Sequence, residues 1–157
     1  MYSKLRKRIL TVAALAGSLA AVAPATADAH PFPGPGYPKY KYEGRYPEAT
    51  PCKYGLNASR TARLGSRRIT LKYFYSGRCG SFGRIENAPR NCHVTLDRSA
   101  DGGRTSSFIT ETVDPGDNFA YTQVGNNLSG RVSRAALVCD TDPDAPTAEV
   151  LARTNWF

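Results

Sequence analysis

The supply of histidine limits the catalytic chemistry of this chain. It contains two histidines, His30 and His93, so a Ser–His–Asp triad or a histidine-ligated metal would depend on His93. Neither a G-x-S-x-G nor an H-E-x-x-H motif occurs in the sequence. A glycosidase needs only two carboxylates, but no spacing selects a pair among the candidates, which are Glu86, Asp97, Glu111 and Asp117. We therefore expect no catalytic residues and no cofactor, and a small hydrolase ranks last among three functional hypotheses.

Two groups of acidic residues have the composition of a cation site. Residues 97–102, Asp-Arg-Ser-Ala-Asp-Gly, match the first half of an EF-hand loop, with oxygen ligands at positions one, three and five. Position twelve is Phe108 instead of glutamate, and a hairpin turn accounts for the same residues. The second group is Asp140, Asp142 and Asp144, which we interpret as a solvated acidic loop. We expect no metal.

The four cysteines, Cys52, Cys79, Cys92 and Cys139, predict two disulfides. They contain no C-x-x-C pair, which argues against a zinc site. A hairpin that turns near residues 88–90 would separate Cys79 from Cys92 by about 20 Å, beyond the reach of a bridge. Two connectivities remain. We favour Cys52 with Cys79 and Cys92 with Cys139, because each bond then ties neighbouring segments.

Cys79 lies in the sequence Gly-Arg-Cys-Gly-Ser-Phe, which is similar to the surroundings of the nucleophile in papain-like proteases. The similarity ends at Phe82 and Gly83, where that family has Cys and Trp, and no histidine follows His93. We therefore interpret Cys79 as half of a disulfide.

Residues 1–29 have the three parts of a secretory signal peptide. A basic stretch at residues 4–8 precedes an apolar run at residues 9–22, and small residues suited to cleavage follow at 25–29. The run is shorter than the roughly 20 residues of a membrane span. We expect cleavage, secretion and no membrane span in the mature protein. Cleavage after Ala29 removes four basic residues and one acidic residue, which lowers the net charge from +8 to about +5.

Residues 30–51 are rich in proline and tyrosine. Proline fixes φ and removes an amide donor, so neither a helix nor a central strand is expected here. We predict a flexible arm. The alternative is that its tyrosines, mixed with lysine and arginine, stack on sugars or bases; these are Tyr37, Tyr40, Tyr42 and Tyr46.

Residues 52–157 are expected to form a single β-rich domain. The clearest strand runs from Arg68 to Ser76, where Ile69, Leu71 and Tyr73 share one face. Further candidates rich in Val, Ile, Thr, Tyr and Phe are residues 82–86, 92–98, 107–113, 119–124 and 131–139. Strands separated by turn sequences predict a mostly β fold, a small antiparallel β-sandwich or barrel stabilised by two disulfides.

Two segments of this domain are less clear. Residues 53–66 have no regular period, and we expect a short helical turn capped by Asn57 or Ser59. The tail from Glu149 to Phe157 fits either a last strand or a short helix.

A basic run beside the clearest strand is the candidate binding site. Its members are Arg60, Arg63, Arg67, Arg68 and Lys72. Phe74, expected on the exposed face, adds an aromatic ring, and cations beside such a ring can bind a polyanion. Solvated side chains scattered over the surface explain the run equally well.

These features support three hypotheses. The first is a secreted, non-enzymatic binding protein, monomeric and wall-associated or extracellular, whose partner is an anionic cell-wall polymer or an extracellular protein. The second is a secreted protease inhibitor that uses an exposed loop at residues 114–118 or 125–130. The third is the small hydrolase.

Short motifs occur in a fixed order between Cys52 and Ile85: Thr61-Ala62, Leu71-Lys72-Tyr73, residues 75–79 and residues 82–85. In this arrangement the chain resembles a family of uncharacterised secreted proteins of actinobacteria and related Gram-positive bacteria. The resemblance implies secretion and a similar style of fold. That family has no assigned activity, so the resemblance carries over no functional residue.

Overall fold

The computed structural model describes residues 41–141 and 147–157 of the 157-residue chain. The predicted signal peptide, residues 30–40 of the predicted arm, and Asp142 and Asp144 of the predicted acidic loop lie outside the described residues. The elements in chain order are a 3-10 helix η1 (Pro47–Ala49) and the strands β1 (Gly55–Leu64), β2 (Arg67–Ser76), β3 (Gly80–Glu86), β4 (Cys92–Ser99), β5 (Ser107–Thr112), β6 (Phe119–Tyr121), β7 (Val132–Asp140) and β8 (Ala148–Arg153).

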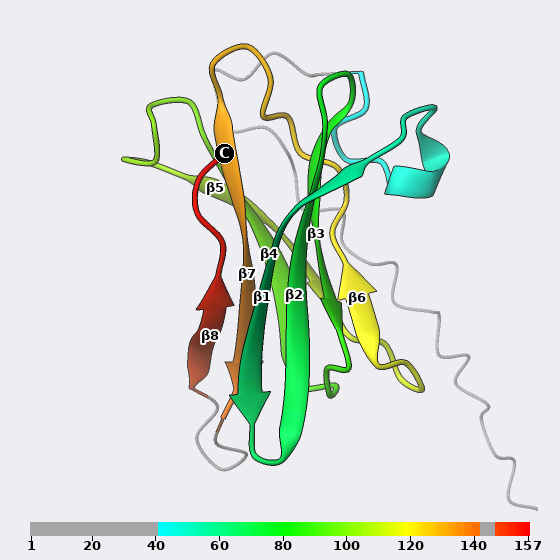
Figure 1. Ribbon diagram of the computed structural model, residues 1–157, viewed down its shortest axis with the longest axis vertical. Helices are drawn as coiled ribbons and strands as arrows, with labels where there is room; N and C mark the ends of the chain where they lie inside the picture. Colours follow the sequence, from blue (N-terminus) through cyan, green and yellow to red (C-terminus); the bar gives the residue numbers. More distant parts are fainter. Residues whose placement is uncertain (1–40, 142–146) are drawn as a thin grey trace, which may run out of the picture.

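The strands form two antiparallel sheets that pack face to face (Figure 1). Sheet A has the order β1-β2-β3-β6, and sheet B has the order β5-β4-β7-β8. This arrangement confirms the predicted antiparallel sandwich. It buries one face of each sheet and leaves the other face for solvent or a ligand.

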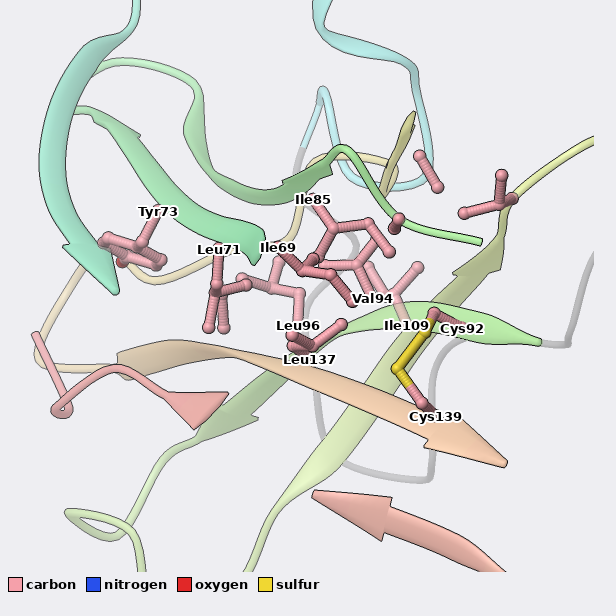
Figure 2. Close-up of a cluster of buried hydrophobic side chains, with 14 residues drawn as sticks. Ile69, Leu71, Tyr73, Ile85, Cys92, Val94, Leu96, Ile109, Leu137 and Cys139 are labelled. Carbon is pink, nitrogen blue, oxygen red and sulfur yellow. A yellow bond between two sulfur atoms is a disulfide. The ribbon is translucent and has the colours of Figure 1, made fainter. Parts of the chain in front are cut away.

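Alternation along the central strands builds the core between the sheets (Figure 2). Ile69, Leu71 and Tyr73 of β2 are fully buried, as the sequence predicted, and they face Leu96 and Leu137 of sheet B. The intervening residues of β2 therefore point to the outer face of sheet A.

Residues 55–64 form a strand, so the predicted helical turn is wrong. The inward positions of β1 hold Ala58, Ala62 and Leu64, which pack against the core. Small alanines gave the sequence little contrast between the two faces, and a register shift between Leu56 and Ala58 breaks the period of two. The tail is resolved in favour of its strand alternative, because β8 pairs with β7.

The predicted hairpin around residues 88–90 does not form. β3 pairs with β2 and β6, whereas β4 pairs with β5 and β7, so the chain crosses from one sheet to the other here. Asn87, with φ 58°, begins this crossing. Cys79 and Cys92 are therefore not separated along one hairpin as predicted, although the favoured connectivity is correct.

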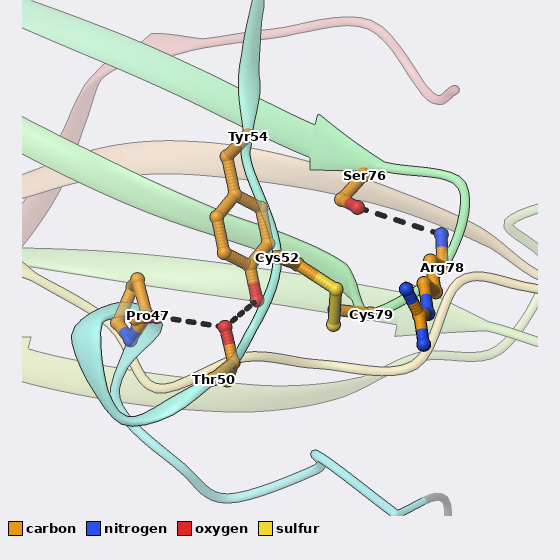
Figure 3. Close-up of a disulfide and its surroundings, with 7 residues drawn as sticks. All are labelled: Pro47, Thr50, Cys52, Tyr54, Ser76, Arg78 and Cys79. Atoms are coloured by element: carbon orange, nitrogen blue, oxygen red, sulfur yellow. Dashed lines mark hydrogen bonds between the residues drawn. A yellow bond between two sulfur atoms is a disulfide. The ribbon is translucent and has the colours of Figure 1, made fainter.

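Both disulfides have the favoured connectivity. Cys92 and Cys139 are direct partners on the central strands β4 and β7, with Cα atoms 4.0 Å apart, and both are fully buried (Figure 2). Cys52 and Cys79, with Cα atoms 6.2 Å apart, join the segment before β1 to the β2–β3 turn (Figure 3). Beside this second bond, Thr50 donates a hydrogen bond to the Pro47 carbonyl at 2.7 Å.

Residues 41–51 pack on the domain, which corrects the prediction of a flexible arm for this part. The Gly44 amide donates to the Val124 carbonyl at 3.0 Å, and the Val124 amide donates to the Arg45 carbonyl at 2.8 Å. Tyr42 is buried. No proline lies between Pro38 and Pro47, so backbone amides are available here for pairing.

Candidate functional site

The β1–β2 hairpin carries all five basic residues that the sequence nominated. Because Ile69 faces the core, Arg68 and Lys72 lie on the outer face of sheet A. Arg63 is the direct cross-strand partner of Arg68, so these two guanidinium groups share that face. Lys72 has a partner, since its Nζ lies 2.6 Å from Oε2 of Glu86.

The other two basic residues have the opposite orientation. Arg60 is the partner of Leu71, and Arg67 is the partner of Leu64. Both arginines therefore lie on the face of the hairpin that points toward sheet B, although both side chains are exposed. The structure therefore brings Arg63 and Arg68 together and separates Arg60 from them. Within residues 41–141 and 147–157, none of these four arginines forms an ion pair with a carboxylate.

Four aromatic rings lie on the outer face of sheet A, on β2, β3 and β6. Phe74 stacks on Phe82 of the neighbouring strand, with ring centroids 4.8 Å apart and an interplanar angle of 8°. Phe119 and Tyr121 lie parallel on β6, with centroids 6.2 Å apart. We call Phe74, Phe82, Phe119 and Tyr121 the aromatic face. The sequence nominated only Phe74 of these four.

The segment before β1 extends the aromatic face. The ring of Tyr46 meets Tyr121 edge to face, with centroids 5.9 Å apart, and its hydroxyl donates to Oε1 of Glu111 at 3.1 Å. The hydroxyl of Tyr121 donates to Oε1 of Glu48 at 3.0 Å. Burial and the Glu111 carboxylate raise the pKa of Tyr46 from 10.0 to about 12. Burial also raises the pKa of Glu111.

Two hollows meet at Tyr121. The larger, about 410 Å³, lies between η1 and sheet A and is lined by Pro47, Glu48, Phe82, Arg84 and Tyr121. The smaller, about 210 Å³, is lined by Tyr46, Glu111, Thr112, Asp114, Asp117, Phe119, Ala120 and Tyr121. We call the two hollows together the Tyr121 groove.

His93 is the cross-strand partner of Thr112, which lines the smaller hollow. It stands on β4, is half-buried and lines neither hollow; burial lowers its pKa. Of the four carboxylates named for a glycosidase, Glu111 and Asp117 both line the smaller hollow, whereas Glu86 and Asp97 line neither hollow. Glu86 pairs with Lys72 and Arg84, while Asp97 pairs with Arg134 on the other sheet.

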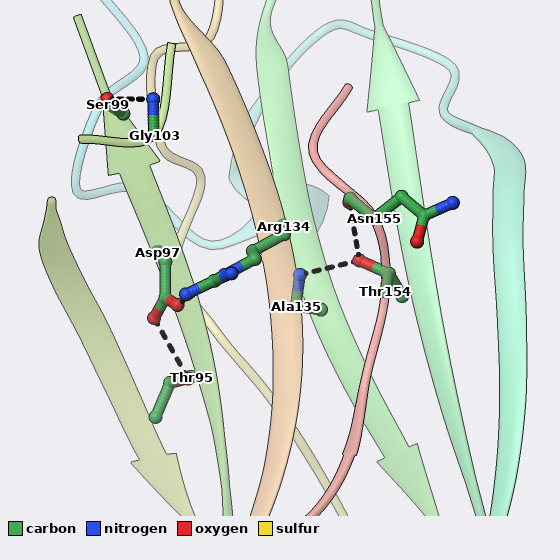
Figure 4. Close-up of polar contacts among 8 residues, drawn as sticks. All are labelled: Thr95, Asp97, Ser99, Gly103, Arg134, Ala135, Thr154 and Asn155. Atoms are coloured by element: carbon green, nitrogen blue, oxygen red, sulfur yellow. Dashed lines mark hydrogen bonds and ion pairs between the residues drawn. The ribbon is translucent and has the colours of Figure 1, made fainter. Parts of the chain in front are cut away.

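The EF-hand match runs from the end of β4 into the β4–β5 turn, as expected, and Figure 4 shows Asp97 in the strand and the Gly103 amide bonded to Oγ of Ser99. Asp97 is in β4, where its Oδ2 accepts a hydrogen bond from Nε of Arg134 at 2.9 Å. Asp101 accepts hydrogen bonds from Ser99 and from Thr105, which lower its pKa. In the described part of the chain, no three His, Cys, Asp or Glu residues lie close enough to hold a metal ion.

Of the two loops nominated for protease inhibition, residues 114–118 are exposed as expected, whereas the loop at 125–130 is only partly exposed. Gly125, Asn126 and Asn127 of that second loop are buried. Val113 is buried, whereas residues 114–118, which follow it, are exposed. Within this loop the Asp117 amide donates a hydrogen bond to the Asp114 carbonyl at 3.1 Å. A tight turn of this kind does not present an extended strand to a protease.

Comparison with protein-family models, with curated proteins and with solved structures finds no match. The resemblance to secreted Gram-positive proteins therefore stays a prediction. Across residues 41–141 and 147–157, no helix is long and apolar enough to cross a membrane.

Proposed function

We propose that this protein is a secreted, non-enzymatic binding protein whose partner is an anionic cell-wall polymer. The binding surface would be the outer face of the β1–β2 hairpin. One observation carries the proposal: Arg63 and Arg68 are direct cross-strand partners, and no carboxylate in the described chain neutralises either of them.

The charge arrangement favours an external anion. Like charges directly opposite each other destabilise a strand pair. Nearby Lys72 has Glu86 as its partner, whereas the arginine pair does not have one. A polymer with repeating phosphate or carboxylate groups supplies the missing charge, and the guanidinium group binds such groups through two parallel hydrogen bonds.

The wall location rests on two sequence features and agrees with the disulfides. Residues 1–29 predict export, and the resemblance stated above concerns secreted proteins of Gram-positive bacteria. Two disulfides are compatible with an oxidising compartment.

Retention on a purified Gram-positive cell wall and on soluble poly(glycerol phosphate) tests the proposal. We expect binding at low salt that weakens steadily as the salt concentration rises. The double variant Arg63→Gln/Arg68→Gln should lose about tenfold or more in affinity, at roughly 1 kcal/mol for each arginine.

The matched control is Arg45→Gln/Arg104→Gln. It makes the same change in net charge at exposed positions in the segment before η1 and in the β4–β5 turn, at the other end of the sandwich from the β1–β2 turn (Figure 1). Equal losses of affinity in the two double variants would mean that net charge alone, and not the arginine pair, determines binding. Absence of binding at low salt would reject the proposal.

A further inference from the structure

The Tyr121 groove exists because residues 41–51 fold back onto sheet A. η1 supplies Pro47 and Glu48, while β3 and β6 supply Phe82, Arg84 and Tyr121. These elements are far apart in sequence: Glu48 and Tyr121, which share a hydrogen bond, are separated by 73 residues. The larger hollow, at about 410 Å³, has the size of a small-ligand site.

Tyr121 is held in place at the junction of the two hollows. Its ring meets the edge of Tyr46 and lies parallel to Phe119, and its hydroxyl is bound to Glu48. An aromatic ring that is already fixed loses little conformational entropy when a ligand packs on it.

Donors and acceptors of hydrogen bonds surround this ring. Arg84, whose side chain is 40% exposed, provides N–H donors. Glu48 and Glu111 provide carboxylate acceptors, one in each hollow, and Asp114 and Asp117 add two more in the smaller one. The groove therefore combines an apolar surface with both kinds of polar group.

This chemistry excludes the simplest ligand classes. Four carboxylates against one arginine repel an anionic chain, in contrast to the β1–β2 hairpin. A metal ion requires ligands that converge, and no three candidate ligands do so in the described residues. A wholly apolar ligand would leave the charged groups desolvated without partners.

A sugar ring satisfies the remaining requirements. The C–H groups of one face can pack on an aromatic ring, while its hydroxyl groups both donate and accept hydrogen bonds. We infer that the Tyr121 groove is a saccharide-binding site that accepts uncharged sugar residues of a polysaccharide. This site is separate from the arginine pair of the hairpin and does not depend on it.

Titration with uncharged oligosaccharides of glucose, mannose, galactose and N-acetylglucosamine tests the inference. Calorimetry or NMR should detect saturable binding of at least one of these probes, with an affinity nearly unchanged between about 50 and about 500 mM salt. Tyr121→Ala should weaken it at least about tenfold.

Phe108→Ala is the matched control, because it removes a 63% exposed ring from β5 on the other sheet. Affinity for the sugar should stay unchanged in this variant and in Arg63→Gln/Arg68→Gln, which separates this site from the hairpin site. Should Tyr121→Ala unfold, Glu48→Gln at an exposed position replaces it and is expected to weaken binding about threefold or more.

Three outcomes would overturn the inference. The first is no binding of any probe at about 10 mM. The second is equal weakening by Tyr121→Ala and Phe108→Ala. The third is binding that falls with salt and is displaced by free lysine, which would assign the groove to an organic ammonium ligand.

Discussion

Glu43, in the segment before η1, forms an ion pair with Arg98 of β4 whose two side chains are only 6% and 4% exposed. Arg98 also donates a hydrogen bond from Nη2 to Oγ of Ser107 at 3.2 Å. The pair connects the segment that forms one wall of the Tyr121 groove to a central strand of the opposite sheet. The position of η1 is therefore linked to the core and not to the surface alone.

The first prediction concerns this pair. Glu43→Gln removes the negative charge from this buried ion pair, and breaking a buried ion pair typically costs about 3–5 kcal/mol. We expect a loss of this size in the free energy of unfolding, measured by urea denaturation. Glu149→Gln, at an exposed position of β8, is the control and should change stability by less than about 0.5 kcal/mol. Similar effects of the two substitutions would show that the pair does not anchor the segment.

The second prediction compares the disulfides. In the chain-entropy model, closed loops of 27 and 47 residues stabilise the fold by about 3.5 and about 4 kcal/mol. Cys92 and Cys139 are both fully buried, so their replacement by alanine also leaves unfilled space in the core. Cys92→Ala/Cys139→Ala should therefore lower the free energy of unfolding more than Cys52→Ala/Cys79→Ala does. The reverse order in urea denaturation would contradict this.

The core was predictable from the sequence where the two faces of a strand differ clearly in the size and hydrophobicity of their side chains. Ile69, Leu71 and Tyr73 alternate with residues of the opposite face, and the structure buries all three. In β1 the inward positions hold alanine and a register shift interrupts the pattern, so the same rule failed there. Alternation depends on apolar residues large enough to mark the buried face.

The Tyr121 groove was not predictable, because its parts meet only in the folded chain. Tyr46 and Glu111 share a hydrogen bond across 65 residues of sequence. A proline-rich composition indicated a flexible arm, and no local pattern showed that residues 41–51 would pack against Val124. One signal was present: Phe119 and Tyr121 flank the inward-facing Ala120, which places two aromatic rings on the outer face of a strand.

The third prediction concerns stability in alkaline solution. Burial and Glu111 raise the pKa of Tyr46 from 10.0 to about 12 in the folded protein. The neutral hydroxyl therefore stabilises the fold fully below the unfolded pKa, and this contribution is lost as the pH rises through about 12. Tyr46→Phe cannot ionise, so the stability of the original protein should fall more steeply than that of the variant between about pH 10 and about pH 12. Urea midpoints across this range measure the difference, and parallel curves would contradict it.

The fourth prediction concerns a buried polar network at the end of the core near Phe157. The Tyr73 hydroxyl accepts a hydrogen bond from Nδ2 of Asn127 at 2.9 Å and shares another with Oγ of Ser133 at 2.7 Å. Its ring stacks on Phe157, with centroids 5.1 Å apart. Tyr73→Phe keeps the stacked ring but leaves the buried Asn127 amide without this acceptor.

Loss of a buried hydrogen-bond partner typically costs about 1–3 kcal/mol, so Tyr73→Phe should lower the free energy of unfolding by that amount. Tyr75→Phe makes the same chemical change at a half-buried position of the same strand and is expected to be close to neutral. Urea denaturation of both variants separates the network from a general effect of removing a hydroxyl. Because the network joins β2, the loop before β7 and β7 itself, its weakening should also speed amide exchange at Ser133, whose amide donates to the Phe157 carbonyl at 3.0 Å. Unchanged exchange there, together with full stability, would mean that packing alone holds this end of the sandwich.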